Sequence, residues 1–266
     1  KGYLFDRRLS LDISVYLNDW RQIVLRQLID QDPATGERLE QPVGVNVNAG
    51  DATVLGGEIA AAFNVTEFLT ATATLGWADA ELDNARQDTY AQFPTFRADC
   101  GTPPATADER KTWFEDCNSR SGDVSGNTLL RQPEWMGSAS LSYDRPLTGE
   151  WNWYTRGDFS YQSDVYTGND NQNWLPAHSY VNAKLGLKSD RYTVELWARN
   201  LFDDGHPTAA FRDIYLANTD NQYAPYLDQG PRPNFDDFVP FRFSVTYPRE
   251  RTYGISATVR FGENYR

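Results

Sequence analysis

The chain has 266 residues, a formal net charge of −12 and a mean hydropathy of −0.63. An acidic protein is repelled by phosphate backbones, so non-specific nucleic-acid binding is excluded as its role. No apolar run reaches the roughly eighteen residues of a transmembrane helix. The length fits one large all-β domain or two small ones. Aromatic residues make up 14% of the chain, which suits either the interfacial girdles of a membrane barrel or a soluble β-sandwich.

Eight segments alternate apolar and polar residues with a period of two, the pattern of a strand with one apolar face. Each is about nine to eleven residues long, the length of a strand in a transmembrane β-barrel. In chain order they begin near Leu9, Leu55, Leu69, Trp135, Trp151, Val181, Tyr192 and Arg251. The last segment shows the pattern plainly, with Tyr253, Ile255, Ala257, Val259 and Phe261 on one face. The sequence therefore predicts an antiparallel β-barrel.

The connections between these segments alternate in length. Short turns are predicted at 64–67, 144–149 and 189–190, and polar connections at 30–51, 80–132, around 168–173 and at 203–250. A soluble sandwich has no reason to alternate in this way, whereas an outer-membrane barrel has short periplasmic turns and long outward loops. Aromatic residues gather beside the short turns, as an interfacial girdle would: Phe63, Phe68, Tyr143, Trp151, Tyr192 and Phe261.

Charged residues fall on the polar parity of the strands. In a barrel they face the lumen, because exposure to lipid costs several kcal/mol each. The alternative is the solvated face of a soluble sheet. The lumen candidates are Glu58, Arg156, Asp158, Glu195 and Arg199, with Asp12 and Lys184 beside them.

The two cysteines, Cys100 and Cys117, lie in one long polar connection. A disulfide there fits an oxidising compartment, and the alternative, a metal site, needs more ligands than are nearby. A bond across a ring of this size stabilises by roughly 3 kcal/mol in the chain-entropy model. We expect the bond to shape a cap over the barrel mouth and to leave strand pairing unaffected.

Several segments together resemble TonB-dependent outer-membrane receptors. They are Leu4-Phe-Asp-Arg-Arg-Leu9, Val54-Leu-Gly-Gly-Glu-Ile59, Leu196-Trp-Ala-Arg-Asn-Leu-Phe-Asp203 and Arg251-Thr-Tyr-Gly-Ile…Val-Arg-Phe261. The resemblance implies a 22-stranded barrel filled by an N-terminal plug, of which residues 1–266 form the last third. It also implies a place in the bacterial outer membrane, among its lipids, and uptake of a siderophore, cobalamin or oligosaccharide driven through the TonB complex.

The chain differs from the family's pattern at both of its ends. The chain starts at Lys1 and shows no plug, TonB box or signal peptide, so we expect a processed product or a piece of a longer protein. The TonB complex is then reached through the missing N-terminal region. Family barrels usually end on an aromatic residue, whereas here the chain continues from Gly262 to Arg266, with Tyr265 as a possible substitute.

The loops hold the candidate ligand contacts, since loops on a rigid scaffold carry recognition. Packing of the loops against one another is the alternative for each aromatic in this set: Trp113, Trp174, Phe211, Tyr215, Tyr223 and Tyr226. The loops are acidic as a set, which argues mildly against a strongly anionic siderophore as the ligand.

No cofactor or metal is expected, and no catalytic set emerges. The acidic pairs Asp203–Asp204 and Asp236–Asp237, and the segment 218–221, have the oxygen ligands that Ca²⁺ takes, but solvated loop charge is the favoured interpretation. The two histidines, His178 and His206, have no partnered Ser or Cys, so a hydrolase triad lacks support.

Two alternatives to a receptor remain. A complete eight-stranded barrel with an anchoring or adhesion role is the first, because eight strands can close around packed side chains. The second alternative is an outer-membrane enzyme whose acid and base would be drawn from Glu58, Asp158 and Glu195. A network of charges in the lumen explains these three residues without any catalysis.

Overall fold

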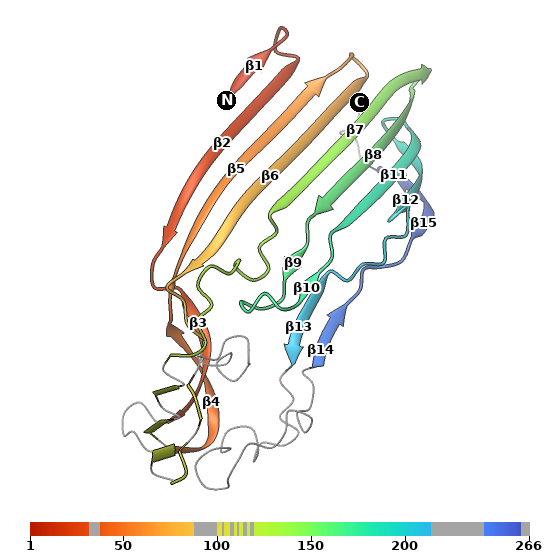
Figure 1. Cartoon of the computed structure of the whole chain (residues 1–266). Helices are drawn as coiled ribbons and strands as arrows, with labels where there is room; N and C mark the ends of the chain where they lie inside the picture. Colours follow the sequence, from red (N-terminus) through yellow and green to blue (C-terminus); the bar gives the residue numbers. More distant parts are fainter. Residues whose placement is uncertain are drawn as a thin grey trace.

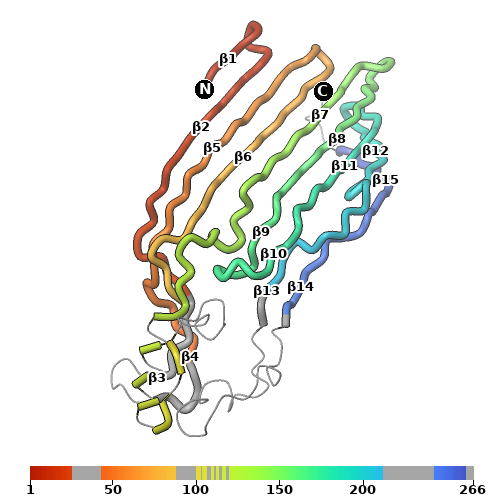
Figure 2. Tube along the Cα trace, in the orientation of Figure 1, coloured from red at the N-terminus to blue at the C-terminus, as the bar shows by residue number. Residues whose placement is uncertain are grey.

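The computed structural model describes residues 1–31, 38–87, 100–102, 104–106, 109–110, 112–113, 116–117, 120–213 and 242–261, with side chains placed outside 26–42 and 212–242. Its main element is a nine-stranded antiparallel sheet, which is curved (Figures 1 and 2). In spatial order the strands are β1 (Gly2–Leu4), β2 (Leu9–Trp20), β5 (Asp51–Asn64), β6 (Leu69–Asp83), β7 (Trp135–Thr148), β8 (Trp151–Gln162), β11 (His178–Lys188), β12 (Tyr192–Arg199) and β15 (Thr252–Val259).

Three two-stranded sheets lie beyond the long-connection end of the main sheet, as Figure 1 shows. They are β3 (Val24–Gln31) with β4 (Arg38–Asn48), β9 (Val165–Tyr166) with β10 (Trp174–Leu175), and β13 (Ala209–Asp213) with β14 (Arg242–Thr246). In the described part of the chain no helix is long and apolar enough to cross a membrane.

The predicted all-β fold is confirmed, and the eight alternating segments are the eight long strands. The first strand, which the sequence predicts to run from Leu9 to about Val24, is too long at its end, because β2 stops at Trp20 and a separate strand starts at Val24. The prediction of a loop over 30–51 is wrong, because the hairpin of β3 and β4 occupies much of it. Val43, Val45 and Val47 alternate with polar residues and glycine there, which was the signal for β4.

The register places apolar residues beside apolar residues throughout the sheet. Ile13 lies opposite Ile59, which lies opposite Leu75, while Thr74 lies opposite Ser138 on the other face. A shift of one residue would send every side chain of a strand to the wrong face, so this pattern fixes the pairing. The sheet thus has an apolar face, which carries Ile13, Ile59 and Leu75, and a polar face, which carries Thr74 and Ser138.

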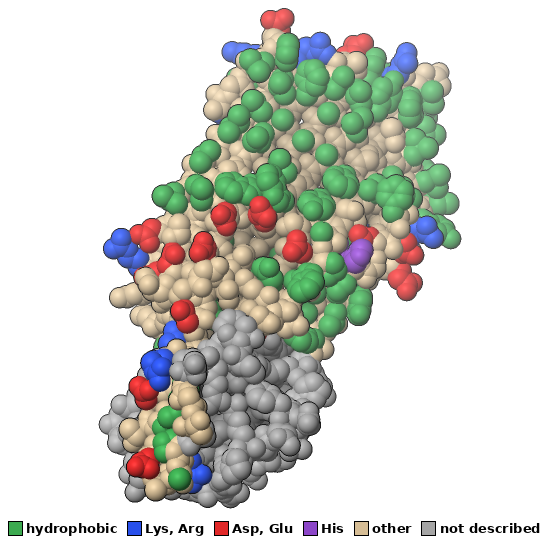
Figure 3. Space-filling model, viewed as in Figure 1, with side chains coloured by type: hydrophobic (Ala, Val, Ile, Leu, Met, Phe, Trp, Pro, Cys, Tyr) green, Lys and Arg blue, Asp and Glu red, His purple; other side chains and the backbone are tan. Residues whose placement is uncertain are grey.

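The apolar face is not covered by any described part of the chain. Val15 and Ile255 are 77% and 73% exposed, and Leu75, near the middle of the sheet, is 45% exposed. Hydrophobic side chains spread over the sheet, and charged ones gather toward its two ends (Figure 3). Soluble proteins rarely expose an apolar area of this extent.

The buried cores lie at the long-connection end instead. One cluster contains Ile23, Leu25, Ala52, Leu82, Ala85 and Val124, and a second contains Val165, Leu175 and Ala210. These cores anchor the connecting segments to the ends of the strands. The sheet therefore presents two possible functional surfaces, its polar face and the packed connections at this end.

Candidate functional site

The polar face carries a network of charged and aromatic side chains on β7, β8, β11 and β12. At its centre is Tyr154 on β8, whose hydroxyl donates to Glu195 Oε2 on β12 at 2.7 Å. The ring crosses β11 to reach it, because the residue between them is Gly186. A Cβ on Gly186 would lie 2.8 Å from two atoms of the tyrosine ring. The glycine is thus what allows a side chain to span three strands.

Two lysines flank this tyrosine on β11. Lys184 Nζ lies 5.8 Å and Lys188 Nζ 5.5 Å from the centroid of the Tyr154 ring, within range of cation–π attraction. Each also has a carboxylate partner: Lys184 lies 3.8 Å from Glu195, and Lys188 contacts Asp144 on β7. The charges of this network therefore compensate one another across the sheet.

A third ion pair lies farther along β8. Arg156 contacts Asp158 at 2.7 Å, and its guanidinium also donates to Ser142 Oγ at 3.4 Å. Arg199 on β12 instead lies over the Trp197 ring, 5.3 Å from its centroid. Trp197 in turn donates from its indole to Ser256 Oγ at 3.0 Å and covers Gly254.

All five charges predicted for the lumen lie on the polar face. Arg156 pairs with Asp158, Glu195 belongs to the network around Tyr154, and Arg199 lies on the same strand as Glu195, over Trp197. Glu58 is exposed on β5, three strands from β8, and does not join the network. Sequence reasoning missed the parts played by Tyr154, Lys188 and Asp144, although all three share the parity of the predicted charges.

The connections at the mouth are held by side-chain amides. Asn169 and Asn171, between β9 and β10, dock the loop on the segment before β7: Asn171 Oδ1 accepts from Thr128 N at 2.8 Å, and Asn171 Nδ2 donates to Thr128 O at 2.9 Å. Asn169 is buried and donates to Gln87 Oε1 at 2.9 Å. The Asn-rich run 169–173 was the sequence signal for this contact, which was not predicted.

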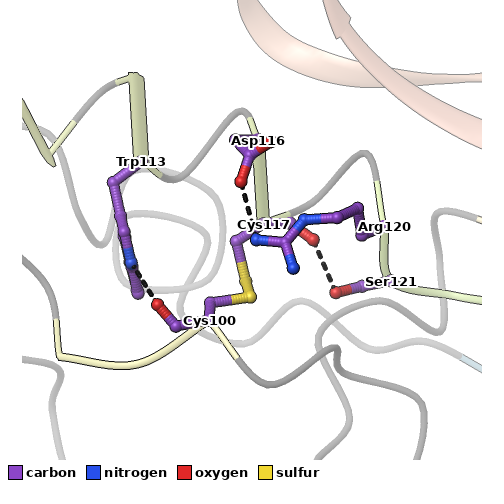
Figure 4. Close-up of a disulfide and its surroundings, with 6 residues drawn as sticks. All are labelled: Cys100, Trp113, Asp116, Cys117, Arg120 and Ser121. Carbon is purple, nitrogen blue, oxygen red and sulfur yellow. Dashed lines mark hydrogen bonds and ion pairs between the residues drawn. A yellow bond between two sulfur atoms is a disulfide. The ribbon is translucent and has the colours of Figure 1, made fainter.

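The predicted disulfide is confirmed. Cys100 and Cys117 are bonded, with Cα atoms 5.5 Å apart (Figure 4). The Trp113 indole donates to the carbonyl of Cys100 at 2.7 Å, and Ser121 Oγ donates to the carbonyl of Cys117 at 2.7 Å. Val124, three residues beyond Ser121, belongs to the buried cluster that also contains Leu82 of β6. The disulfide is thus linked to the end of the sheet through residues 121–124.

The loop aromatics differ in their surroundings. Trp113 contacts the disulfide loop, as the packing alternative expects. Trp174 is 61% exposed on β10, and Phe211 is 51% exposed on β13, with Arg131 Cζ 4.4 Å from its ring centroid. The remaining three candidates, Tyr215, Tyr223 and Tyr226, lie outside the described residues.

The segment Asn200–Asp204 ties three strands together. Asn200 is buried and accepts from Asp204 N at 2.9 Å, while its amide donates to Arg249 O at 3.1 Å. Asp204 Oδ2 accepts from Ser179 N at 2.9 Å, and Asp203 Oδ1 accepts from Arg251 N at 2.7 Å. Asn200 and Asp203 adopt φ values of 50° and 59°, which Asn and Asp tolerate better than most residues.

This geometry sets the charge state of Asp204. Burial acts to raise the pKa of its carboxyl, but donation from the N–H groups of Ser179 and His206, and the His206 ring at 2.7 Å, together lower the pKa below its ordinary 3.8. Both carboxylates of the pair Asp203–Asp204 thus serve the backbone. Among the residues with described positions, no group of three or more His, Cys, Asp or Glu is arranged to hold a metal ion. Residues 218–221 and the pair Asp236–Asp237 lie outside them.

Residues 1–201 match the TonB dependent receptor-like, beta-barrel family. The chain belongs to this family. Its members are outer-membrane transport receptors rather than enzymes. No curated protein shows significant sequence similarity to the chain.

Solved receptor structures share the fold of this TonB-dependent receptor chain. The ferric yersiniabactin uptake receptor FyuA from Yersinia pestis aligns with a TM-score of 0.59 and 14% identity, covering 96% of this chain and 28% of FyuA. The ferric-catecholate import receptor Fiu from E. coli K12 aligns with a TM-score of 0.53 and 16% identity, covering 97% of this chain and 26% of Fiu. The siderophore receptor PiuA from Acinetobacter baumannii aligns with a TM-score of 0.52 and 16% identity, covering 96% of this chain and 26% of PiuA. The chain thus spans roughly a quarter of the length of each of these receptors.

Proposed function

We propose that this chain is the C-terminal part of the barrel of an outer-membrane receptor that takes up a scarce ligand with energy supplied through TonB. The observation that carries the proposal is the division of one sheet into an uncovered apolar face and a charge-compensated polar face. Lipid tolerates the first and excludes the second, so the polar face lines the lumen. Short turns then lie on the periplasmic side, and the connections holding the disulfide lie outside.

The proposal extends to the parts of the receptor outside residues 1–266. A plug and a TonB-contacting segment precede Lys1 in the whole protein and meet the polar face from inside the barrel. The first ligands to test are ferric siderophores, because FyuA, Fiu and PiuA are described as receptors for such compounds or their iron complexes. Cobalamin and oligosaccharides are the next classes. The exposed Trp174 and Phe211 are the ligand contacts that we propose within the described loops.

The test is uptake by the whole protein. A strain that lacks the gene is complemented with the full-length coding sequence, and accumulation of ⁵⁵Fe presented on a panel of siderophores is measured with and without functional TonB. We expect uptake of at least one complex, abolished by loss of TonB or by a protonophore. Ligand uptake that continues unchanged without TonB would show the proposal to be wrong.

The alternative is a complete small barrel with an anchoring or adhesion role. It requires the first and last strands to pair, and the described structure has β1 and β15 at opposite ends of the strand order. A sheet edge left open in a membrane has unsatisfied backbone groups, which favours further strands on both sides. Refolding of the 266-residue chain in detergent separates the two ideas. Heat-modifiable migration as a folded monomer favours the small barrel, and failure to fold alone favours the receptor.

A further inference from the structure

The apolar face is not evenly filled. A shallow groove of about 510 Å³ crosses it from β5 to β11. Its floor is made of small side chains, since Ala61 lies opposite Ala73 and Ala73 lies opposite Ala139. Its volume is within the range of roughly 300–1,000 Å³ that holds small ligands.

Large apolar side chains form the sides of this groove. Phe63 lines it on β5, Leu141 on β7 and Phe159 on β8. Leu141 and Phe159 remain 54% and 43% exposed, so nothing in the described structure covers them. The groove therefore has the surface of a site for a flexible apolar chain.

Two arginines lie between this groove and the short-turn end. Arg145 shares the apolar face of β7 with Leu141, four residues and thus about 13 Å away. Its Cζ lies 5.5 Å from the centroid of the Phe68 ring. Arg8 lies with its Cζ 5.7 Å from the ring of Phe63, a side of the groove, but its guanidinium already donates to the carbonyl of Asn64, at 2.9 Å, and to the carbonyl of Val65. Arg145, over the Phe68 ring, is therefore the better placed of the two cations for an anion bound beside the groove.

We propose that this surface binds one anionic phospholipid, with an acyl chain in the groove and its phosphate at Arg145. Guanidinium groups suit phosphate oxygens because they can donate two parallel hydrogen bonds. This inference rests on the proposed function, since it takes the apolar face to be in lipid and the short turns to be periplasmic. The occupant then belongs to the periplasmic leaflet.

A phospholipid fits both parts of the surface better than a second protein chain does. A protein partner would need apolar side chains shaped to the groove and carboxylates set about 13 Å away along the strand, whereas a lipid has a flexible chain and a phosphate in one molecule. The lipid should be anionic overall, because the ammonium group of a zwitterionic head would compete with Arg145 for the phosphate.

The test uses the purified full-length receptor, delipidated in detergent and titrated with dioleoyl-phosphatidylglycerol under native mass spectrometry. Arg145→Gln removes the phosphate contact, and Ala73→Leu combined with Ala139→Leu fills the groove with apolar atoms. Two controls make comparable changes away from the groove. Arg191→Gln removes an arginine that stacks on Tyr192 at 5.4 Å, and Ala257→Leu enlarges an exposed alanine on β15, which does not line the groove.

We expect the affinity for the first bound phosphatidylglycerol to fall about tenfold in each test variant, as the loss of a charged hydrogen bond or of the chain site predicts. It should stay unchanged in both controls, and phosphatidylcholine should bind more weakly to the parent protein. Equal losses in tests and controls, no loss in the groove-filled variant, or equal binding of the two lipids would each overturn the proposal. Heat-modifiable migration verifies that every variant is folded. A receptor that reaches the outer membrane and imports its ligand, yet shows no such preference, fails this inference alone.

Discussion

The two faces of the sheet are built from the same strands but by different rules. On the apolar face, neighbours such as Ile59 and Leu75 need only be apolar, and no partner has to be in a set position. On the polar face, Tyr154, Glu195 and Lys184 depend on one another's positions to within a hydrogen bond. The apolar face should therefore tolerate substitution of one apolar side chain by another but not the introduction of a charge. The polar face should tolerate an added charge but not a larger residue at a position where a neighbouring side chain already packs.

The largest expected effect is a charge on the apolar face. Leu75→Arg should destabilise the folded receptor by about 2–4 kcal/mol if Leu75 lies near the bilayer midplane. Its neighbour Thr74 lies on the polar face and bonds to Ser138 at 2.8 Å. Thr74→Arg loses that bond and should cost only about 1 kcal/mol. Urea titration of the full-length receptor in bilayers measures both, and equal costs would contradict the assignment of the faces.

The next effect comes from filling space on the polar face. Gly186→Ala puts a methyl group 2.8 Å from atoms of the Tyr154 ring and 2.6 Å from the carbonyl oxygen of Val194, and overpacking of this kind costs about 1–3 kcal/mol. Gly157→Ala on the neighbouring strand is the matched control, because a Cβ there meets nothing within 4 Å. The same titration should show a change within about 0.5 kcal/mol for the control. Similar values for both would mean that the tyrosine does not need the glycine.

A smaller effect should follow from removing one hydroxyl. Tyr154→Phe keeps the ring between the lysines but loses the bond to Glu195, at a cost of about 1 kcal/mol. Tyr161→Phe, on the apolar face of the same strand, should cost less, since Tyr161 is 39% exposed and its hydroxyl has no hydrogen bond among the described residues. A larger loss for Tyr161 than for Tyr154 would contradict the network.

The smallest expected effect depends on pH and concerns the mouth, where Asp204 is held as a carboxylate. Because its pKa is lowered on folding, its contribution is complete above the ordinary value of 3.8 and is lost as the pH falls below it through the folded pKa. Thermal melts of the parent and Asp204→Asn should therefore differ at pH 7 and converge toward pH 3. A difference that grows as the pH falls would reverse the sign.

Much of this architecture follows from local pattern. The eight long strands are readable from period-two alternation, and the two faces from parity, because each depends only on residues close together in the sequence. The disulfide was predictable because the chain has only two cysteines and both lie in one connection. The alternation of short and long connections identified which end carries the loops.

What could not be predicted depends on register between distant segments. Tyr154 and Glu195 are far apart in the chain, and only the pairing of β8, β11 and β12 brings them within 2.7 Å. Asn171 and Thr128 likewise meet because a loop folds back on a segment more than forty residues earlier. Local periodicity states which face a side chain takes but not which residue lies opposite it.

The pairing of a large ring with a glycine occurs at three places on the polar face: Tyr16 over Gly56, Tyr154 over Gly186 and Trp197 over Gly254. In each pair neither residue can change freely, since a side chain in place of the glycine displaces the ring, and loss of the ring uncovers the glycine. The two positions should therefore vary together as the family diverges. Such linked variation would reveal the register between paired strands from sequences alone. In this fold the aromatic–glycine pairs thus specify a register that the alternation within each strand does not determine.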